Sequence, residues 1–334
     1  MKPNRNLFAL PGALLLLANP AAGASVYDNN ISALNINMLT DVFMSYTNYG
    51  DKMSDLFTGR TVYGTMNRFG EYGDDGSTIQ TFEGPSSDRY LINNIWLNAN
   101  HVNAQMRYGD GISQHGRFNL VTVGGTTQKS HLTYGNISFG GFVSYINTKM
   151  PDFTGGGSVV GLFANYKYHG FGARALLDNG SLNNGDTVNF NNSWINFALD
   201  LSHTFKIDDT FLIRPGVYGG YTFVSSDDLH LNGDKISSKD YHFFNVAPGI
   251  KFIKEISPNW YGALSAKYVA HFGGDNDINI GDSAMIKGLD LDNHTDIGLD
   301  IEHNYKHFVF GGNVHKQMGG MDGWSGNINI KYVF

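Results

Sequence analysis

The chain has 334 residues, of which 42 are Gly and none is Cys, and its formal net charge is −7. Without Cys it has no disulfides, no thiolate metal ligands and no Cys nucleophile, and its negative charge argues against nucleic acid as a partner. Charged residues are only 16% of the chain, against about 25% in ordinary soluble domains. This composition suits a β-barrel exported from a bacterial cell, although a secreted β-solenoid would share much of it.

Residues 1–24 have the three parts of a secretory signal peptide. Lys2 and Arg5 give a basic start, Leu7 to Leu17 form an apolar run, and Ala22-Gly23-Ala24 is a small-residue cleavage site. The apolar run is too short to cross a membrane as a helix, so we expect export followed by cleavage. No later run is long enough for a transmembrane helix, which excludes a helical membrane protein.

A helical pattern follows in the segment 25–89. Between about 35 and 58, apolar residues recur at three- and four-residue steps, and this predicts one helix, which Gly50 weakens in the middle. The set is Leu39, Val42, Phe43, Tyr46, Met53, Leu56 and Phe57. Such a helix could lie against the surface of a domain or be held inside a barrel lumen. Residues 59–89 are rich in Gly, Asp and Ser and predict a polar linker.

From Tyr90 to the end, apolar and polar residues alternate with a period of two, which predicts strands with one apolar and one polar face. We expect twelve strands, near residues 93–107, 116–127, 132–147, 158–168, 171–178, 191–206, 210–225, 240–254, 260–272, 289–304, 307–317 and 323–334. A soluble barrel or sandwich would show the same alternation, so the connections must decide between the classes.

Short and long connections alternate along the predicted strands. Short connections follow the fourth, sixth, eighth and tenth strands, whereas long polar connections follow the third, fifth, seventh and ninth, at residues 148–157, 179–190, 226–239 and 273–288. This sorting is typical of outer-membrane barrels, which have tight periplasmic turns and longer external loops. The sequence therefore predicts an all-β fold, a transmembrane antiparallel barrel of about twelve strands over residues 90–334, with both barrel ends on the periplasmic side.

The polar strand faces carry acids and bases that we expect inside the lumen, pairing across strands or lining a pore. They are Asp200, Lys206, Arg214, Lys251, Lys267, Asp296, Asp300, Glu302 and Lys306. A barrel hydrolase is the least favoured reading, because no Gly-x-Ser-x-Gly motif is present and no paired acids stand next to a His. The segment Gly273–Ser283 is like a calcium loop, but its Gly comes one place late and Ile286 stands where Glu is needed. We expect no catalytic, cofactor or metal site.

The last strand, Trp324 to Phe334, ends in NINIKYVF and has aromatic residues at both ends of its apolar face. With the predicted helix and about twelve strands, this ending resembles the autotransporter β-domain, the translocator of type V secretion, over roughly residues 31–334. In that family the helix threads the pore, and the outer-membrane assembly machinery reads the terminal strand. The resemblance implies an outer-membrane barrel plugged by its N-terminal helix, with an assembly signal made of Ile328, Ile330, Tyr332 and Phe334.

The chain departs from the family pattern before the helix. Only about ten residues, SVYDNNISAL, separate the predicted signal peptide from the helix, where autotransporters normally carry a large passenger. Three explanations are open. The barrel has lost its passenger, it acts alone as a porin-like or loop-displaying surface barrel, or it serves a passenger from another chain. Expected partners are outer-membrane lipid, the assembly machinery and a possible passenger polypeptide. Asn29-Asn30 could mark self-cleavage, but a polar turn is the simpler interpretation.

Overall fold

The computed structural model describes residue 53, residues 70–72 and 78–80, and residues 91–334 apart from short gaps. The gaps are residues 109–111, 133–134, 152–153, 186–189, 232–233, 239, 274–277, 281–283 and 287–290. The predicted signal peptide and nearly all of the predicted helix at 35–58 lie outside the described residues. Among the residues that are described, no helix is long and apolar enough to cross a membrane.

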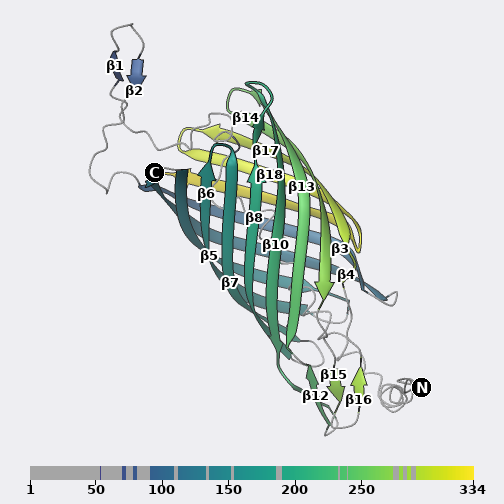
Figure 1. Cartoon of the computed structure of the whole chain (residues 1–334). Helices are drawn as coiled ribbons and strands as arrows, with labels where there is room; N and C mark the ends of the chain where they lie inside the picture. Colours follow the sequence, from purple (N-terminus) through teal and green to yellow (C-terminus); the bar gives the residue numbers. More distant parts are fainter. Residues whose placement is uncertain are drawn as a thin grey trace, which may run out of the picture.

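Twelve antiparallel strands form a closed barrel (Figure 1), which confirms the predicted all-β antiparallel barrel and its number of strands. The barrel closes because the last strand, β19, pairs with the first, β3. Its strands are β3 (Leu91–Tyr108), β4 (Ile112–Leu132), β5 (Gly135–Lys149), β6 (Thr154–Tyr168), β7 (Phe171–Gly185), β8 (Phe190–His203), β10 (Phe211–Ser226), β13 (Tyr241–Ser257), β14 (Trp260–Gly273), β17 (His294–Tyr305), β18 (Phe308–Gly319) and β19 (Met321–Val333). A two-residue strand, β9 (Phe205–Lys206), pairs with the start of β10.

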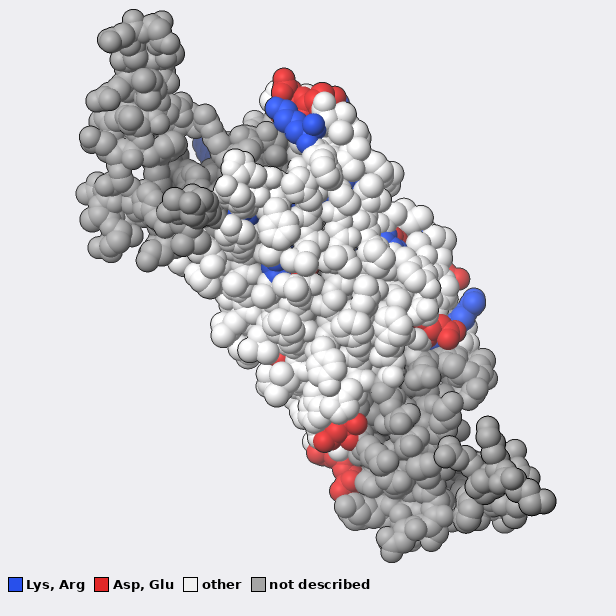
Figure 2. Space-filling view, viewed as in Figure 1, with Lys and Arg blue, Asp and Glu red and all other residues white. Residues whose placement is uncertain are grey.

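Alternation along the strands places apolar residues on the outside of the barrel. In β8, Ile195, Phe197 and Leu199 are 52%, 53% and 39% exposed, whereas Asn196 between them is fully buried. This is the reverse of a soluble barrel, in which the apolar face points inward. Figure 2 shows the result on one side of the molecule, where charged side chains gather at the two ends and few lie between them. An uncharged band around the barrel is what a lipid boundary requires.

The short connections predicted from the sequence are tight turns. His169 and Gly170 have φ of 45° and 83°, positive at both central residues, as a type I′ hairpin turn requires. Asn259 and Lys306 also have positive φ, 68° and 53°, in the turns between β13 and β14 and between β17 and β18. After β9, the backbone N–H of Thr210 donates to Asp208 Oδ1 at 2.7 Å, which lowers the pKa of this carboxyl below its usual value.

The long connections differ from the prediction at two places. Residues 148–157 and 179–190 were expected as loops, but β6 begins at Thr154 and β7 continues to Gly185, so strand covers most of both ranges. The two longest connections contain short strands, β11 (Leu229–Leu231), β12 (Asp234–Ser238), β15 (Ile278–Ile280) and β16 (Ala284–Ile286). These pair as one sheet, in which β12 and β15 join the two loops. The sheet lies at the end of the barrel opposite to the C-terminus (Figure 1).

Inside the lumen, the side-chain rings of five described residues each lie over a glycine on the neighbouring strand. Each ring and its glycine are direct cross-strand partners, and a Cβ at the glycine would overlap the ring. The pairs are Trp96 with Gly124, Phe163 with Gly140, Phe142 with Gly161, Trp194 with Gly180, and His315 with Gly298. Part of the high glycine content is thus explained by rings that occupy the space of a missing side chain.

The predicted linker over 59–89 contains a small hairpin. Its strands β1 (Gly70–Tyr72) and β2 (Thr78–Gln80) pair with each other and not with the barrel. Ahead of the hairpin, Met53 is described, and it is only 7% exposed.

Candidate functional site: the barrel lumen

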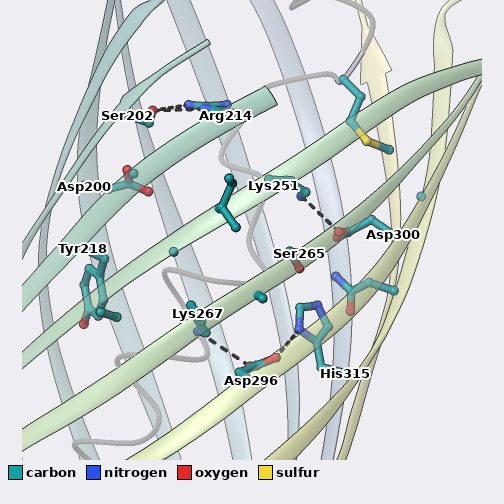
Figure 3. Close-up of a pocket in the computed structure, with 18 of the residues that line it drawn as sticks. Asp200, Ser202, Arg214, Tyr218, Lys251, Ser265, Lys267, Asp296, Asp300 and His315 are labelled. Atoms are coloured by element: carbon teal, nitrogen blue, oxygen red, sulfur yellow. Dashed lines mark hydrogen bonds and ion pairs between the residues drawn. The ribbon is translucent and has the colours of Figure 1, made fainter. Parts of the chain in front are cut away.

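A cavity of about 230 Å³ lies in the lumen and is lined by charged residues from β7 to β18 (Figure 3). Its cations are Arg174, Arg214, Lys251 and Lys267, and its carboxylates are Asp200, Asp296, Asp300 and Glu302. Seven of these eight were predicted lumen charges. They come to one place because each sits at an inward position of its strand and the strands are neighbours in the sheet.

Two ion pairs cross the cavity wall, one between the neighbouring strands β14 and β17 and one from β13 over β14 to β17. Lys251 Nζ lies 3.1 Å from Asp300 Oδ2, and Lys267 Nζ lies 3.7 Å from Asp296 Oδ2. His315 Nδ1 is 2.7 Å from the other oxygen of Asp296, so Figure 3 shows a chain of Lys267, Asp296 and His315. Asp296 is 2% exposed and has two partners, as a buried carboxylate needs.

The two arginines of the cavity donate hydrogen bonds to neutral side chains. Arg214 donates from Nε and Nη2 to Ser202 Oγ, at 3.0 and 2.8 Å, and Arg174 Nε donates to Asn165 Oδ1 at 3.1 Å. Arg214 and Lys251 are direct cross-strand partners, an unfavourable arrangement of like charges that the bond from Lys251 to Asp300 partly offsets. Four cations face four carboxylates, so the formal charges of the lining cancel when His315 is neutral.

A residue from far upstream lies in this lumen. Met53 packs with Leu212, Ile253, Tyr261 and Ala263, an apolar cluster beside the short turns of the barrel. The backbone N–H of Met53 donates to Glu302 Oε2 at 2.9 Å. Met53 also lines the charged cavity. Met53 itself therefore lies inside the barrel.

Two of the predicted lumen charges lie elsewhere. Lys206 follows the end of β8, and its Nζ pairs with Asp209 at 2.7 Å in an exposed turn. Lys306 is a turn residue with positive φ, and its Nζ lies 5.3 Å from the ring centre of Tyr305. Both were assigned by alternation, but the strands have already reached the short-turn end at these positions, so neither side chain lines the cavity.

Sequence reasoning missed Arg174 and His315 as cavity residues. Both stand at inward positions of strands whose outward residues are apolar, so the alternation that assigned the other charges also contained them. Sequence spacing gave no sign that His315 would meet Asp296, because that contact depends on the register between β17 and β18. Among the residues that the structure describes, no three His, Asp or Glu side chains gather as metal ligands.

The four residues of the proposed assembly signal face outward at the end of the chain. Ile328, Ile330 and Phe334 are 70%, 40% and 61% exposed. Tyr332 stacks edge-on with Phe334, with ring centres 5.0 Å apart, and also contacts Phe308 on the neighbouring strand. The chain thus ends in an aromatic cluster on the outer surface, at the short-turn end of the barrel.

No family model matches the sequence, and no curated protein matches it. Solved structures do resemble it. The β-domain of the Bordetella autotransporter BrkA has a TM-score of 0.60 at 12% identity, covering 73% of this chain and 100% of that one. The transport unit of AIDA-I from Escherichia coli gives 0.52 at 17% identity, covering 77% and 93%. The translocator domain of NalP from Neisseria meningitidis gives 0.54 at 12%, covering 76% and 90%. At these identities the likeness concerns the fold, and the fold of this chain is that of the autotransporter β-domains.

Proposed function

We propose that this chain is an outer-membrane β-barrel of the autotransporter translocator type, whose N-terminal segment enters the lumen and plugs it. The observation that carries the proposal is the position of Met53, buried inside the barrel and bonded to Glu302. A segment that only lay on the surface of the domain would not bring this residue against Leu212 and Ile253. The aromatic end of β19 acts as the assembly signal, and outer-membrane lipid surrounds the apolar band.

A pair of cysteines tests whether the segment occupies the lumen, and the chain has no native Cys to interfere. In the variant Met53→Cys with Ala263→Cys, oxidation should link the two positions, because Met53 and Ala263 belong to one cluster. The linked form is read by its faster migration on a non-reducing gel and by mass spectrometry. Met53→Cys with Leu264→Cys is the control, because Leu264 is 52% exposed on the outside. Equal linkage in both variants would contradict the proposal.

Conductance tests whether the segment closes the pore. A variant without residues 25–60 should conduct more than the full chain in planar bilayers, provided that it still shows the heat-dependent gel shift of a folded barrel. An unchanged conductance would show that the N-terminal segment does not close the pore.

A second candidate is a channel or surface barrel with no role in secretion. The charge-balanced lumen cavity favours it, as does the likeness to an outer-membrane channel from Pseudomonas putida, at a TM-score of 0.50 and 7% identity over 73% of this chain. In this case the full chain would already conduct steadily, and no passenger polypeptide would reach the cell surface. A passenger fused after the signal peptide and found outside the cell would favour the translocator.

A further inference from the structure

One outward row of residues near the long-loop end contains three cations. Direct cross-strand pairing from β18 through β19, β3 and β4 to β5 aligns Lys316, Trp324, Asn103, Arg117 and Lys149. We call this set the cationic row. Arg117 and Lys149 are exposed, and the side chain of Lys316 is 33% exposed.

An apolar groove of about 950 Å³ begins beside the cationic row and runs toward the short-turn end. Small residues on three neighbouring strands, Ala99, Gly312 and Gly326, leave space along it. Leu299 and Ile328, which are 63% and 70% exposed, stand beside them. The groove occupies the space that larger side chains would fill at these three small residues, and its lining is mainly apolar. Both features suit an extended hydrocarbon chain.

The cationic row lies at the boundary where the wall leaves the lipid. Beyond the row, toward the long loops, the pattern of the strands inverts. The inward residues Met106 and Met150 are apolar and at most 3% exposed, whereas the outward residue His115 is polar and exposed. Apolar inside and polar outside is the pattern of a barrel wall in water. Trp324 in the row is 58% exposed, and Trp favours membrane–water boundaries.

The cations of the row are only partly neutralised. Lys316 pairs with Asp322 at 2.5 Å. Arg117 and Lys149 are direct cross-strand partners, and like charges in that position repel each other. Within the described part of the chain neither of these two side chains forms an ion pair. A phosphate between them would remove the repulsion and accept hydrogen bonds from both, with the guanidinium binding two oxygens.

We propose that the groove and the cationic row together bind one phosphorylated, acylated glucosamine lipid of the outer leaflet. One acyl chain lies along Ala99, Gly312 and Gly326, and a phosphate lies between Arg117 and Lys149. The inference rests on the proposed function, which places the long-loop end in the outer leaflet. Free phosphate would use the cations alone, and a zwitterionic phospholipid would bring no net negative charge to them.

Binding is measured on the purified full chain in neutral detergent by native mass spectrometry and by the shift of the unfolding temperature. The probes are lipid A, phosphatidylglycerol, phosphatidylethanolamine and inorganic phosphate. Lipid A should bind most tightly, and the double variant Arg117→Ala with Lys149→Ala should weaken it by about tenfold or more, as expected for the loss of charge-assisted hydrogen bonds. Lys254→Ala is the control, because Lys254 is an exposed cation at the short-turn end, bonded to Thr210. Equal effects of both, or equal binding of all anionic probes, would overturn the proposal.

The groove is tested separately by filling it. Ala99→Trp should weaken lipid A binding, whereas Ala175→Trp, at an outward position of β7 away from the groove, should not. If neither variant changes binding, the groove has no part in it and the proposal fails. These assays do not depend on orientation in cells. Surface labelling of the long loops decides the orientation by itself, so an error in the proposed topology and an error in the lipid site give different results.

Discussion

Trp194 shows how one glycine sets the position of a lumen side chain. Its ring lies over Gly180 on β7, and its indole N–H donates to Asp178 Oδ1 at 3.0 Å. The other oxygen of Asp178 accepts from Asn196 Nδ2 at 2.7 Å, and Asn196 in turn accepts from Thr222. A chain of hydrogen bonds thus crosses β7, β8 and β10 inside the barrel. It depends on the absence of a side chain at one position.

Gly180→Val should destabilise the barrel by about 1–3 kcal/mol, the usual cost of forcing extra atoms into a packed site. The added Cβ would displace the ring of Trp194 and leave Asp178 without one of its donors. The shift in the urea midpoint of the refolded protein measures this loss. Gly219→Val is the matched control, since a Cβ there meets only the carbonyl of Asn245 at 3.7 Å. Similar losses in the two variants would show that the ring does not matter.

The sequence predicts the face of a residue better than its partner. Alternation alone places Leu199 outside and Lys267 inside, because the pleat of a strand fixes the direction of each side chain. It does not predict that Lys267 meets Asp296, because the partner depends on the register between β14 and β17. It also fails at strand ends, where Lys306 is already in a turn and the rule no longer applies.

At the scale of single strands, the strand ends were harder to predict than the strands. After Asp178 the sequence is rich in Asn and its apolar alternation stops, so it predicts a loop over 179–190. The structure continues β7 to Gly185, because backbone pairing with β6 and β8 persists where the apolar pattern of the outer face has ended. Beyond the lipid boundary outward positions need no apolar side chain, so the sequence signal disappears before the strand does.

Leu264 and Ser265 on β14 allow the lipid boundary to be tested with one substitution at adjacent residues. Leu264→Arg should cost about 2–4 kcal/mol, the penalty for a cation against lipid near the middle of the bilayer. Ser265→Arg should be tolerated better, because Ser265 lines the lumen cavity with its four carboxylates. Refolding yield into lipid vesicles and the urea midpoint give the comparison. Equal damage would mean that β14 does not border lipid.

The end of β19 is expected to direct assembly. Phe334→Ser removes an outward ring that packs on Tyr332, and we expect the protein to collect in the periplasm, with a several-fold loss from outer-membrane fractions. Val333→Ser, one residue earlier and outside the aromatic set, is the control. Normal levels of the Phe334 variant in the outer membrane would refute the assembly role.

For the whole molecule, the two ends of the barrel are different in kind. The short-turn end has tight turns, aromatic rings and the C-terminus, and the lumen there holds Met53. The long-loop end carries the sheet made of β11, β12, β15 and β16, in which two loops distant in sequence pair with each other. The sequence predicted long polar loops here but not their pairing, because strands of three to five residues leave almost no pattern in a sequence. This asymmetry makes the two ends of the barrel distinguishable.

Direction is tested by inserting the same epitope at each end. An epitope at Asp228, exposed in the connection between β10 and β11, should be labelled by antibody on intact cells, because loops of this length face outward in outer-membrane barrels. An epitope at Pro258, in the turn between β13 and β14, should be labelled only after the outer membrane is opened. Both insertions fall between strands, where an added segment is tolerated best. Labelling of intact cells at Pro258 and not at Asp228 would show that the barrel has the opposite orientation in the membrane.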